Sequence, residues 1–105
     1  MPVAATLDIE SMRAAALQAT SFLRTLANPD RLLLLCQLTQ GEKSVGELEE
    51  LLGIVQPTLS QQLAVLRQEE LVATRRAGKQ IYYSVKDAKV LVILNQLYSL
   101  YCKDH

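Results

Sequence analysis

The chain has 105 residues, half of them apolar and 21% charged, which is the composition of a globular domain and excludes an intrinsically disordered chain. Eleven basic and eleven acidic residues cancel, so the chain has no overall charge excess of the kind that attracts nucleic acid. No apolar run approaches the ~20 residues needed to cross a bilayer, and residues 1–13 show no secretory signal, so we expect a cytoplasmic protein without a membrane partner.

Apolar residues recur at three- and four-residue steps over residues 8–26, which is the period of an amphipathic helix. Asn28 and Pro29 then predict the start of a second helix, because the asparagine amide can accept from a free backbone N–H and proline needs no donor in a first turn. We expect this helix to run to about Gln40 and to end at Gly41 in left-handed backbone.

The next segment predicts a helix-turn-helix over about residues 44–68. The sequence SVGE matches a capping box, in which Ser44 and Glu47 each bond the other's backbone N–H at the start of a short helix. Gly53 ends that helix, and Pro57 opens a fourth helix that runs to about residue 68. We expect a turn of three or four residues between the two helices.

Two β-rich runs, VATRR and QIYYSV, flank a short polar stretch that contains Gly78, which predicts a hairpin over about residues 72–85. A last helix is expected over about residues 87–102. This order of elements predicts a mainly α fold with a small β-hairpin. It is a winged helix-turn-helix, expected to form a single DNA-binding domain over residues 1–105.

The fourth helix has an outward face that is polar but almost uncharged. Leu59, Leu63 and Leu66 form one stripe toward the core, which leaves small and amide side chains on the opposite side. A solvated face would more often carry Glu and Lys, whereas amides and hydroxyls can hydrogen-bond base edges in the major groove. The alternative is a polar surface helix with no ligand.

The basic residues cluster although the net charge is zero. Residues 72–86 contain Arg75, Arg76, Lys79 and Lys86 and no acid, and residues 53–68 contain Arg67 and no acid. Phosphate binding responds to such a local field, so the sequence predicts a positive face beside the fourth helix. The alternative is a solvated hairpin that is basic by chance.

The last helix is apolar around nearly its whole circumference, from Val90 to Cys102. A terminal helix of a small domain meets only one neighbouring face, so we expect the other faces to meet a second copy of the chain across a twofold axis. In that homodimer the helices over about residues 8–26 and 87–102 form the contact. Two recognition helices about one turn of DNA apart would then bind a palindromic operator in double-stranded DNA.

Three segments, NPDRLLLLCQL, SVGELEELLGIVQPTLSQQLAVLRQEELV and TRRAGKQIYYSV, resemble the ArsR/SmtB winged-helix repressors of bacteria. The similarity runs from about Phe22 to Cys102, and it implies a homodimeric transcriptional repressor that occupies an operator until an inducer binds. Matching motif positions imply DNA contacts at Gln56, Thr58, Ser60 and Gln61 of the fourth, recognition helix and at Arg76, Lys79 and Gln80 of the hairpin, or wing.

Most members of that family sense metals or metalloids, but this sequence departs from their ligand patterns. The arsenic type has a cysteine pair in the third helix, and the zinc type has Asp and His pairs along the last, whereas the only histidine here is His105. The remaining pair, Cys36 and Cys102, resembles the dithiol branch, which responds to reactive sulfur species such as persulfides or to oxidants. In that branch the two thiols of one subunit join, directly or through inserted sulfur atoms, and the repressor leaves DNA without any cofactor.

Alternatives remain open for the two cysteines. Cys36 follows four leucines, and a buried, unreactive thiol explains that position about equally well. Two cysteines from each subunit could instead hold a metal in a dimer. A bridge requires that packing bring the two Cα atoms within about 7 Å. Burial opposes ionisation of Cys36, so we expect Cys102 to attack first, with Lys103 and Arg31 as candidate helpers.

An enzyme is not expected, because the chain shows no phosphate-binding glycine loop and no Ser/His/Asp or Cys/His arrangement. A winged-helix adaptor that binds another protein is the remaining alternative. Binding to a palindromic DNA fragment distinguishes a repressor from such an adaptor.

Overall fold

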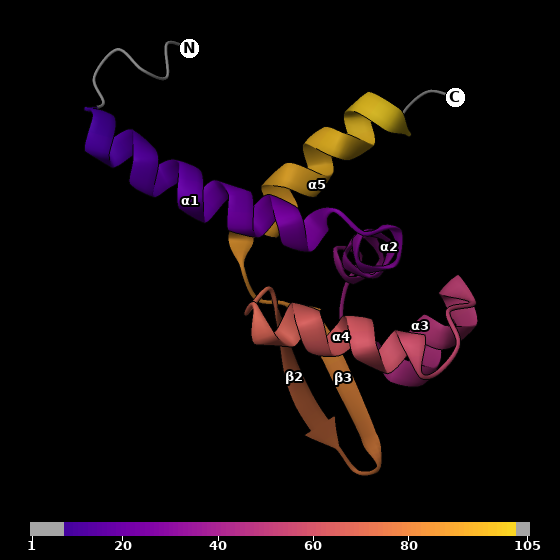
Figure 1. The fold of residues 1–105 in the computed structure, drawn as a ribbon. Helices are drawn as coiled ribbons and strands as arrows, with labels where there is room; N and C mark the ends of the chain where they lie inside the picture. The colour runs from indigo at the N-terminus through magenta and orange to yellow at the C-terminus, as the bar shows by residue number, and fades with distance from the viewer. Residues whose placement is uncertain (1–7, 103–105) are drawn as a thin grey trace.

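The computed structural model describes residues 8–102, and its elements follow the predicted order with one added strand (Figure 1). The elements are α1 (Ile9–Leu26), α2 (Pro29–Leu38), β1 (Lys43–Ser44), α3 (Val45–Leu52), α4 (Thr58–Gln68), β2 (Val72–Ala77), β3 (Gln80–Val85) and α5 (Ala88–Tyr101). The mainly α, winged helix-turn-helix fold predicted from the sequence is therefore confirmed.

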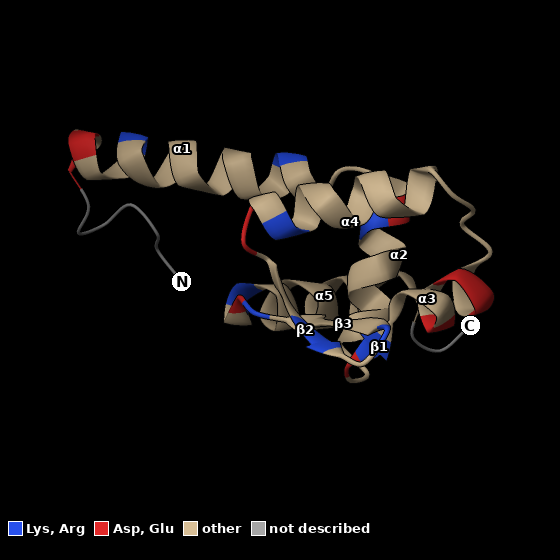
Figure 2. Ribbon diagram, turned by 90° about the horizontal axis from the view of Figure 1, so that it is seen from below, with Lys and Arg blue, Asp and Glu red and all other residues tan. Residues whose placement is uncertain are grey.

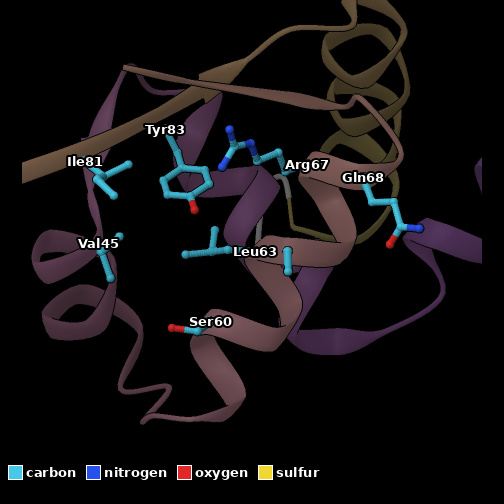
Figure 3. A pocket seen from close by; sticks show the side chains of 8 residues that line it. Val45, Ser60, Leu63, Arg67, Gln68, Ile81 and Tyr83 are labelled. Atoms are coloured by element: carbon cyan, nitrogen blue, oxygen red, sulfur yellow. The ribbon is translucent and has the colours of Figure 1, made fainter. Parts of the chain in front are cut away.

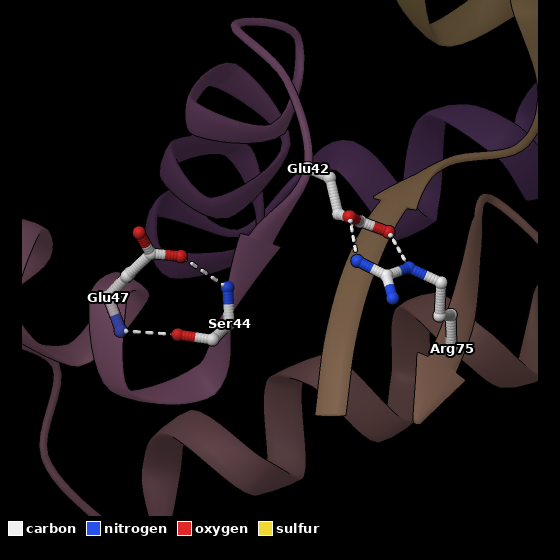
Figure 4. Close-up of polar contacts among 4 residues, drawn as sticks. All are labelled: Glu42, Ser44, Glu47 and Arg75. Carbon is white, nitrogen blue, oxygen red and sulfur yellow. Dashed lines mark hydrogen bonds and ion pairs between the residues drawn. The ribbon is translucent and has the colours of Figure 1, made fainter. Parts of the chain in front are cut away.

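Side chains cap four of the helices at their first turns, and at the start of α5 Asp87 accepts from the backbone N–H of Lys89 at 2.9 Å. Asp8 accepts from the backbone N–H of Ser11 at 2.7 Å at the start of α1, and Asn28 accepts from that of Arg31 at 3.0 Å at the start of α2. The capping box of α3 is complete: Ser44 Oγ accepts from the N–H of Glu47 at 3.1 Å, and Glu47 Oε1 accepts from the N–H of Ser44 at 2.8 Å (Figure 4). These bonds satisfy backbone donors that a helix leaves free, which fixes where each helix begins.

Two predicted boundaries are wrong. Helix α2 ends at Leu38 and is capped by Thr39, whose hydroxyl donates to the carbonyl of Cys36 at 2.6 Å and so competes with continuation of the helix. Gly41 therefore lies in the following loop, with φ of +133°, and does not form the left-handed cap. The turn between α3 and α4 spans residues 53–57, which is longer than predicted, although Gly53 does end α3 in left-handed backbone.

The wing, which is the hairpin of β2 and β3, belongs to a three-stranded antiparallel sheet in the order β1-β3-β2. Strands β2 and β3 pair from Val72 opposite Val85 to Ala77 opposite Gln80, and Gly78 in the connecting turn has φ of +63°. The hairpin was predicted, but β1 was not, because two residues are too short to show a strand period. By pairing with β3, β1 attaches the wing to the start of α3.

Leucines of α2, α3 and α4 form the centre of the core. The predicted α4 stripe of Leu59, Leu63 and Leu66 is at most 1% exposed, so its assignment to the core is confirmed. It packs against α2, and the sheet covers part of the same cluster. The recognition helix is thus held by its apolar side, with its polar side left outward.

Helices α1 and α5 bury far less of their surface. Helix α1 projects beyond the rest of the molecule in Figure 1 and buries only Thr25 and Leu26 at its end. Helix α5 buries Val90 and Leu94, so in the single chain only one of its faces is covered. Among residues 8–102, no helix is both long and apolar enough to cross a membrane.

Candidate nucleic-acid interface and thiol pair

The start of α4 presents three of the four polar residues that the resemblance assigns to DNA, and the fourth, Gln56, lies in the turn before the helix and not in the helix itself. Gln56, Ser60 and Gln61 are exposed and Thr58 is half-buried. Gln56 Oε1 also accepts from the backbone N–H of Ser60 at 3.1 Å, which compensates for Pro57 at the cap position, because proline has no side-chain oxygen. Gln56 therefore has a structural role that the sequence did not reveal, and its amide N–H groups donate to no other described residue.

The three predicted wing residues gather at the far end of the hairpin. Arg76 pairs across the sheet with Ile81, and Gln80 follows the turn that contains Lys79. All three predicted residues, Arg76, Lys79 and Gln80, are exposed. The end of the hairpin thus carries two cations and an amide, which suits contact with a phosphate backbone.

The positive face is smaller than the sequence indicates. Arg75 donates through Nε and Nη2 to the two carboxylate oxygens of Glu42, at 2.9 and 2.7 Å (Figure 4). Its guanidinium also lies 4.7 Å from the centre of the Tyr82 ring. The hydrogen bonds from Arg75 hold the pKa of Glu42 below its usual value. Lys86 Nζ lies 2.9 Å from a carboxylate oxygen of Glu70. Two of the four basic residues in residues 72–86 are therefore paired with acids.

Charge is still segregated between β2 and α3 (Figure 2). Figure 2 shows basic residues along β2 and acidic residues along α3. Arg76 and Lys79 take part in no ion pair within the part of the chain that the structure describes. Of the four basic residues in residues 72–86, the two that remain available to phosphate are thus those nearest the tip of the wing.

A cleft of about 510 Å³ separates α4 from the wing, and it contains a basic residue that was not assigned to DNA (Figure 3). Ser60, Ala64 and Arg67 line it from α4, and Tyr83 lines it from β3. Arg67 is exposed and extends beside Tyr83. Ser60, Ala64 and Arg67 follow one another at steps of four and three residues, which puts them on one face of a helix. This spacing could have predicted that Arg67 faces the wing.

The two thiols come from elements that pack together. Cys36 is on α2, Cys102 caps the end of α5, and these helices contact each other. Both cysteines are exposed in the single chain, so Cys36 is not the buried core thiol of the alternative interpretation. Partial burial raises the pKa of the Cys36 thiol, and the nearby Cys102 raises it further.

The proposed thiol helpers are not supported. Arg31 donates through its guanidinium to two backbone carbonyls and to Gln62 and makes no hydrogen bond to Cys36 within residues 8–102, so its role as a helper of Cys36 stays a prediction. Lys103 and His105 lie outside the described residues.

Comparison with known proteins decides the family. A protein-family model described as "Bacterial regulatory protein, arsR family" matches residues 28–74. A biofilm growth-associated repressor of Xylella fastidiosa is 50% identical over 93 residues, which is 89% of this chain and 82% of the relative. The chain belongs to the ArsR family.

Solved structures of ArsR-family relatives have the same fold. The transcriptional repressor BigR from Xylella fastidiosa superposes with a TM-score of 0.85 at 48% identity, covering 93% of this chain and 100% of that one. Reduced HlyU from Vibrio cholerae gives a TM-score of 0.86 at 37% identity, covering 90% of this chain and 100% of that one. The predicted resemblance to ArsR/SmtB repressors is therefore confirmed.

A metal site in this ArsR-family chain would need ligands from beyond one subunit's described residues. Within residues 8–102, no three His, Cys, Asp or Glu side chains lie close enough together to hold an ion. Two cysteines alone supply half of a tetrahedral thiolate site. The other half would have to come from a second copy of the chain or from residues outside 8–102.

Proposed function

We propose that the chain is a homodimeric, sequence-specific repressor of transcription whose hold on a palindromic operator is switched by covalent linkage of Cys36 to Cys102. The observation that carries the DNA-binding role is the outward face of α4, which is polar, nearly uncharged and flanked by the cationic tip of the wing. Amides and hydroxyls on this face supply donors and acceptors for base edges, and the wing supplies phosphate contacts.

The homodimer is supported by apolar surface left on two helices. On α5, Leu100 and Tyr101 are 70% and 73% exposed, and on α1, Leu17 is 73% exposed. A groove of about 1180 Å³ lies between the two helices and includes Phe22 and Val92. A monomer rarely leaves so many large apolar side chains in water, and a second copy would cover them.

The thiol switch can proceed without a cofactor. A persulfide transfers one sulfur atom to a cysteine thiolate and departs as a thiol. The other cysteine then attacks the cysteine sulfur, forms the disulfide and expels hydrosulfide. If both cysteines carry an added sulfur, the same displacement leaves a bridge of three sulfur atoms and expels one hydrosulfide. With peroxide, the two thiols lose two electrons and two protons, and peroxide is reduced to water.

Linkage would reach the DNA face through packed helices. Helix α2 contacts α5 on one side and α4 on the other. A bond between Cys36 and Cys102 would draw the end of α5 toward α2 and shift the surface proposed for the dimer. Because the operator fixes the distance between two recognition helices, a small shift there weakens binding.

The test is binding of the reduced protein to a palindromic fragment from its own promoter region, followed by fluorescence anisotropy. We expect affinity to fall as salt rises, and persulfide or peroxide to weaken binding about 5- to 150-fold. Intact mass should show loss of two hydrogens for a disulfide, or a net gain of sulfur for a longer bridge. Cys36→Ser and Cys102→Ser should bind DNA and resist release.

The outcomes separate the candidate functions. Release of both serine variants by the same reagents would eliminate the thiol switch. Release by metal salts, with the covalent mass unchanged, would favour a metal-responsive repressor that uses the cysteines as ligands. Absence of any operator binding by the reduced protein would favour the protein-binding adaptor.

A further inference from the structure

Arg31 connects three helices through its side chain. Neither the proposed DNA contacts nor the proposed thiol switch uses this connection. Its Nε donates to the carbonyl of Thr25 at 2.6 Å and its Nη2 to that of Arg24 at 3.3 Å, both in the last turn of α1. Its Nη1 donates to Oε1 of Gln62 on α4 at 2.8 Å. One half-buried guanidinium at the start of α2 thus joins α1, α2 and α4.

The charge of Arg31 is satisfied inside the protein. The last carbonyls of a helix have no partners within the helix and carry partial negative charge, which suits a guanidinium. The forked geometry of arginine lets it bond these carbonyls and Gln62 at the same time, which the single ammonium of lysine cannot do. Arg31 is therefore built to fix one helix relative to two others.

The hydrogen bond from Arg31 to Gln62 restricts rotation and sliding of α4, which the apolar contacts of α4 do not. Leucine side chains resist separation of α4 from the core, but they are not directional, and helices can slide or rotate on such contacts. A hydrogen bond to a charged group is directional and short. Within residues 8–102, the Arg31–Gln62 bond is the only side-chain hydrogen bond between α4 and another helix.

We propose that Arg31 is a positioning residue that sets the rotation of the recognition helix through Gln62 and ties it to the end of α1. This inference rests on the proposed role of α4 in DNA binding. Gln62 is adjacent along α4 to residues of the outward face. The Arg31–Gln62 bond would therefore set the angle at which that face meets a major groove. Movement of α1 at the dimer contact is then transmitted to the DNA face through one side chain.

A double-mutant cycle on operator affinity tests the proposal. Arg31→Met keeps the length of the stem and removes the donors, and Gln62→Ala removes the acceptor while adding a strong helix former. We expect each single change to lower the affinity of the reduced protein about tenfold, as for loss of a hydrogen bond to a charged group, and the double variant to lose no more than either one. The slope of log affinity against log salt should stay unchanged, because no phosphate contact is lost.

The controls separate positioning from simple destabilisation. Gln37→Ala removes another half-buried glutamine, one without a side-chain hydrogen bond in the described chain, and should leave affinity unchanged. Melting curves fix an assay temperature at which every variant is folded. If Arg31→Met does not fold there, Arg31→Lys, which keeps the charge and loses the fork, takes its place in the cycle.

Additive losses in the double variant would overturn the proposal, as would a salt slope lowered by about one on removal of the Arg31 charge, since that marks a direct phosphate contact. Either result would leave the proposed function intact. If the unaltered protein binds no operator, the proposed function falls and the positioning role falls with it.

Discussion

At the residue scale, surroundings decide the reactivity of the two cysteines. Both belong to apolar helices and both are exposed in the single chain, yet partial burial and the neighbouring thiol raise the pKa of Cys36. A raised pKa means that Cys36 keeps its proton to higher pH and holds less thiolate at neutral pH. This supports the expectation that Cys102 attacks first.

Alkylation kinetics can measure this difference. Iodoacetamide should label Cys36 more slowly than Cys102 near neutral pH, and the Cys36 rate should still rise as pH passes about 8.5, where an ordinary thiol is half ionised. In Cys102→Ser the repulsion between thiolates is gone, so Cys36 should label faster than in the unaltered chain, although burial still slows it. Peptide mass spectrometry from about pH 6 to pH 10 gives both rates. Faster labelling of Cys36 than of Cys102 at neutral pH would contradict the assignment.

At the element scale, α4 and the wing have separate tasks. The face of α4 has few charges, and the wing tip has cations that no described acid neutralises. Base edges carry sequence information and phosphates do not. We therefore expect changes in α4 to alter specificity and changes in the wing to alter overall affinity.

Two substitutions separate these tasks. Gln61→Ala should cost about 1–3 kcal/mol on the operator and little on unrelated DNA, so discrimination relaxes. Lys79→Ala should weaken binding to all sequences and lower the salt slope by about one. Anisotropy titrations on operator and unrelated DNA at several salt concentrations measure both effects. The opposite pattern would mean that the roles of helix and wing are exchanged.

At the scale of the whole molecule, the exposed apolar surface of α1 and α5 supports the proposed homodimer. A charge placed in the centre of a covered apolar contact is costly, because burial removes its water without supplying a partner charge. Outside such a contact, the same charge is solvated and costs little. Substitution can therefore test the proposed position of the dimer contact.

Leu100→Glu on α5 should shift the protein from dimer to monomer and weaken operator binding at least about tenfold, because one half-site contact is lost. Leu51→Glu is the matched control: Leu51 is also exposed, but it lies on α3, and its change should leave the dimer intact. Sedimentation velocity measures the mass of each variant. A dimer that survives Leu100→Glu and dissociates with Leu51→Glu would place the contact on α3.

The sequence by itself determined the helix starts, the core face of α4 and the hairpin, because caps, apolar periodicity and turn residues act within a few positions of the chain. It also carried the family, through motifs that span most of its length. Only the tertiary structure decided the neutralisation of Arg75 by Glu42, the strand β1, the exposure of Cys36 and the position of Arg31 between three helices. These features join residues far apart in the sequence, so their partners depend on how the helices pack and not on any local pattern.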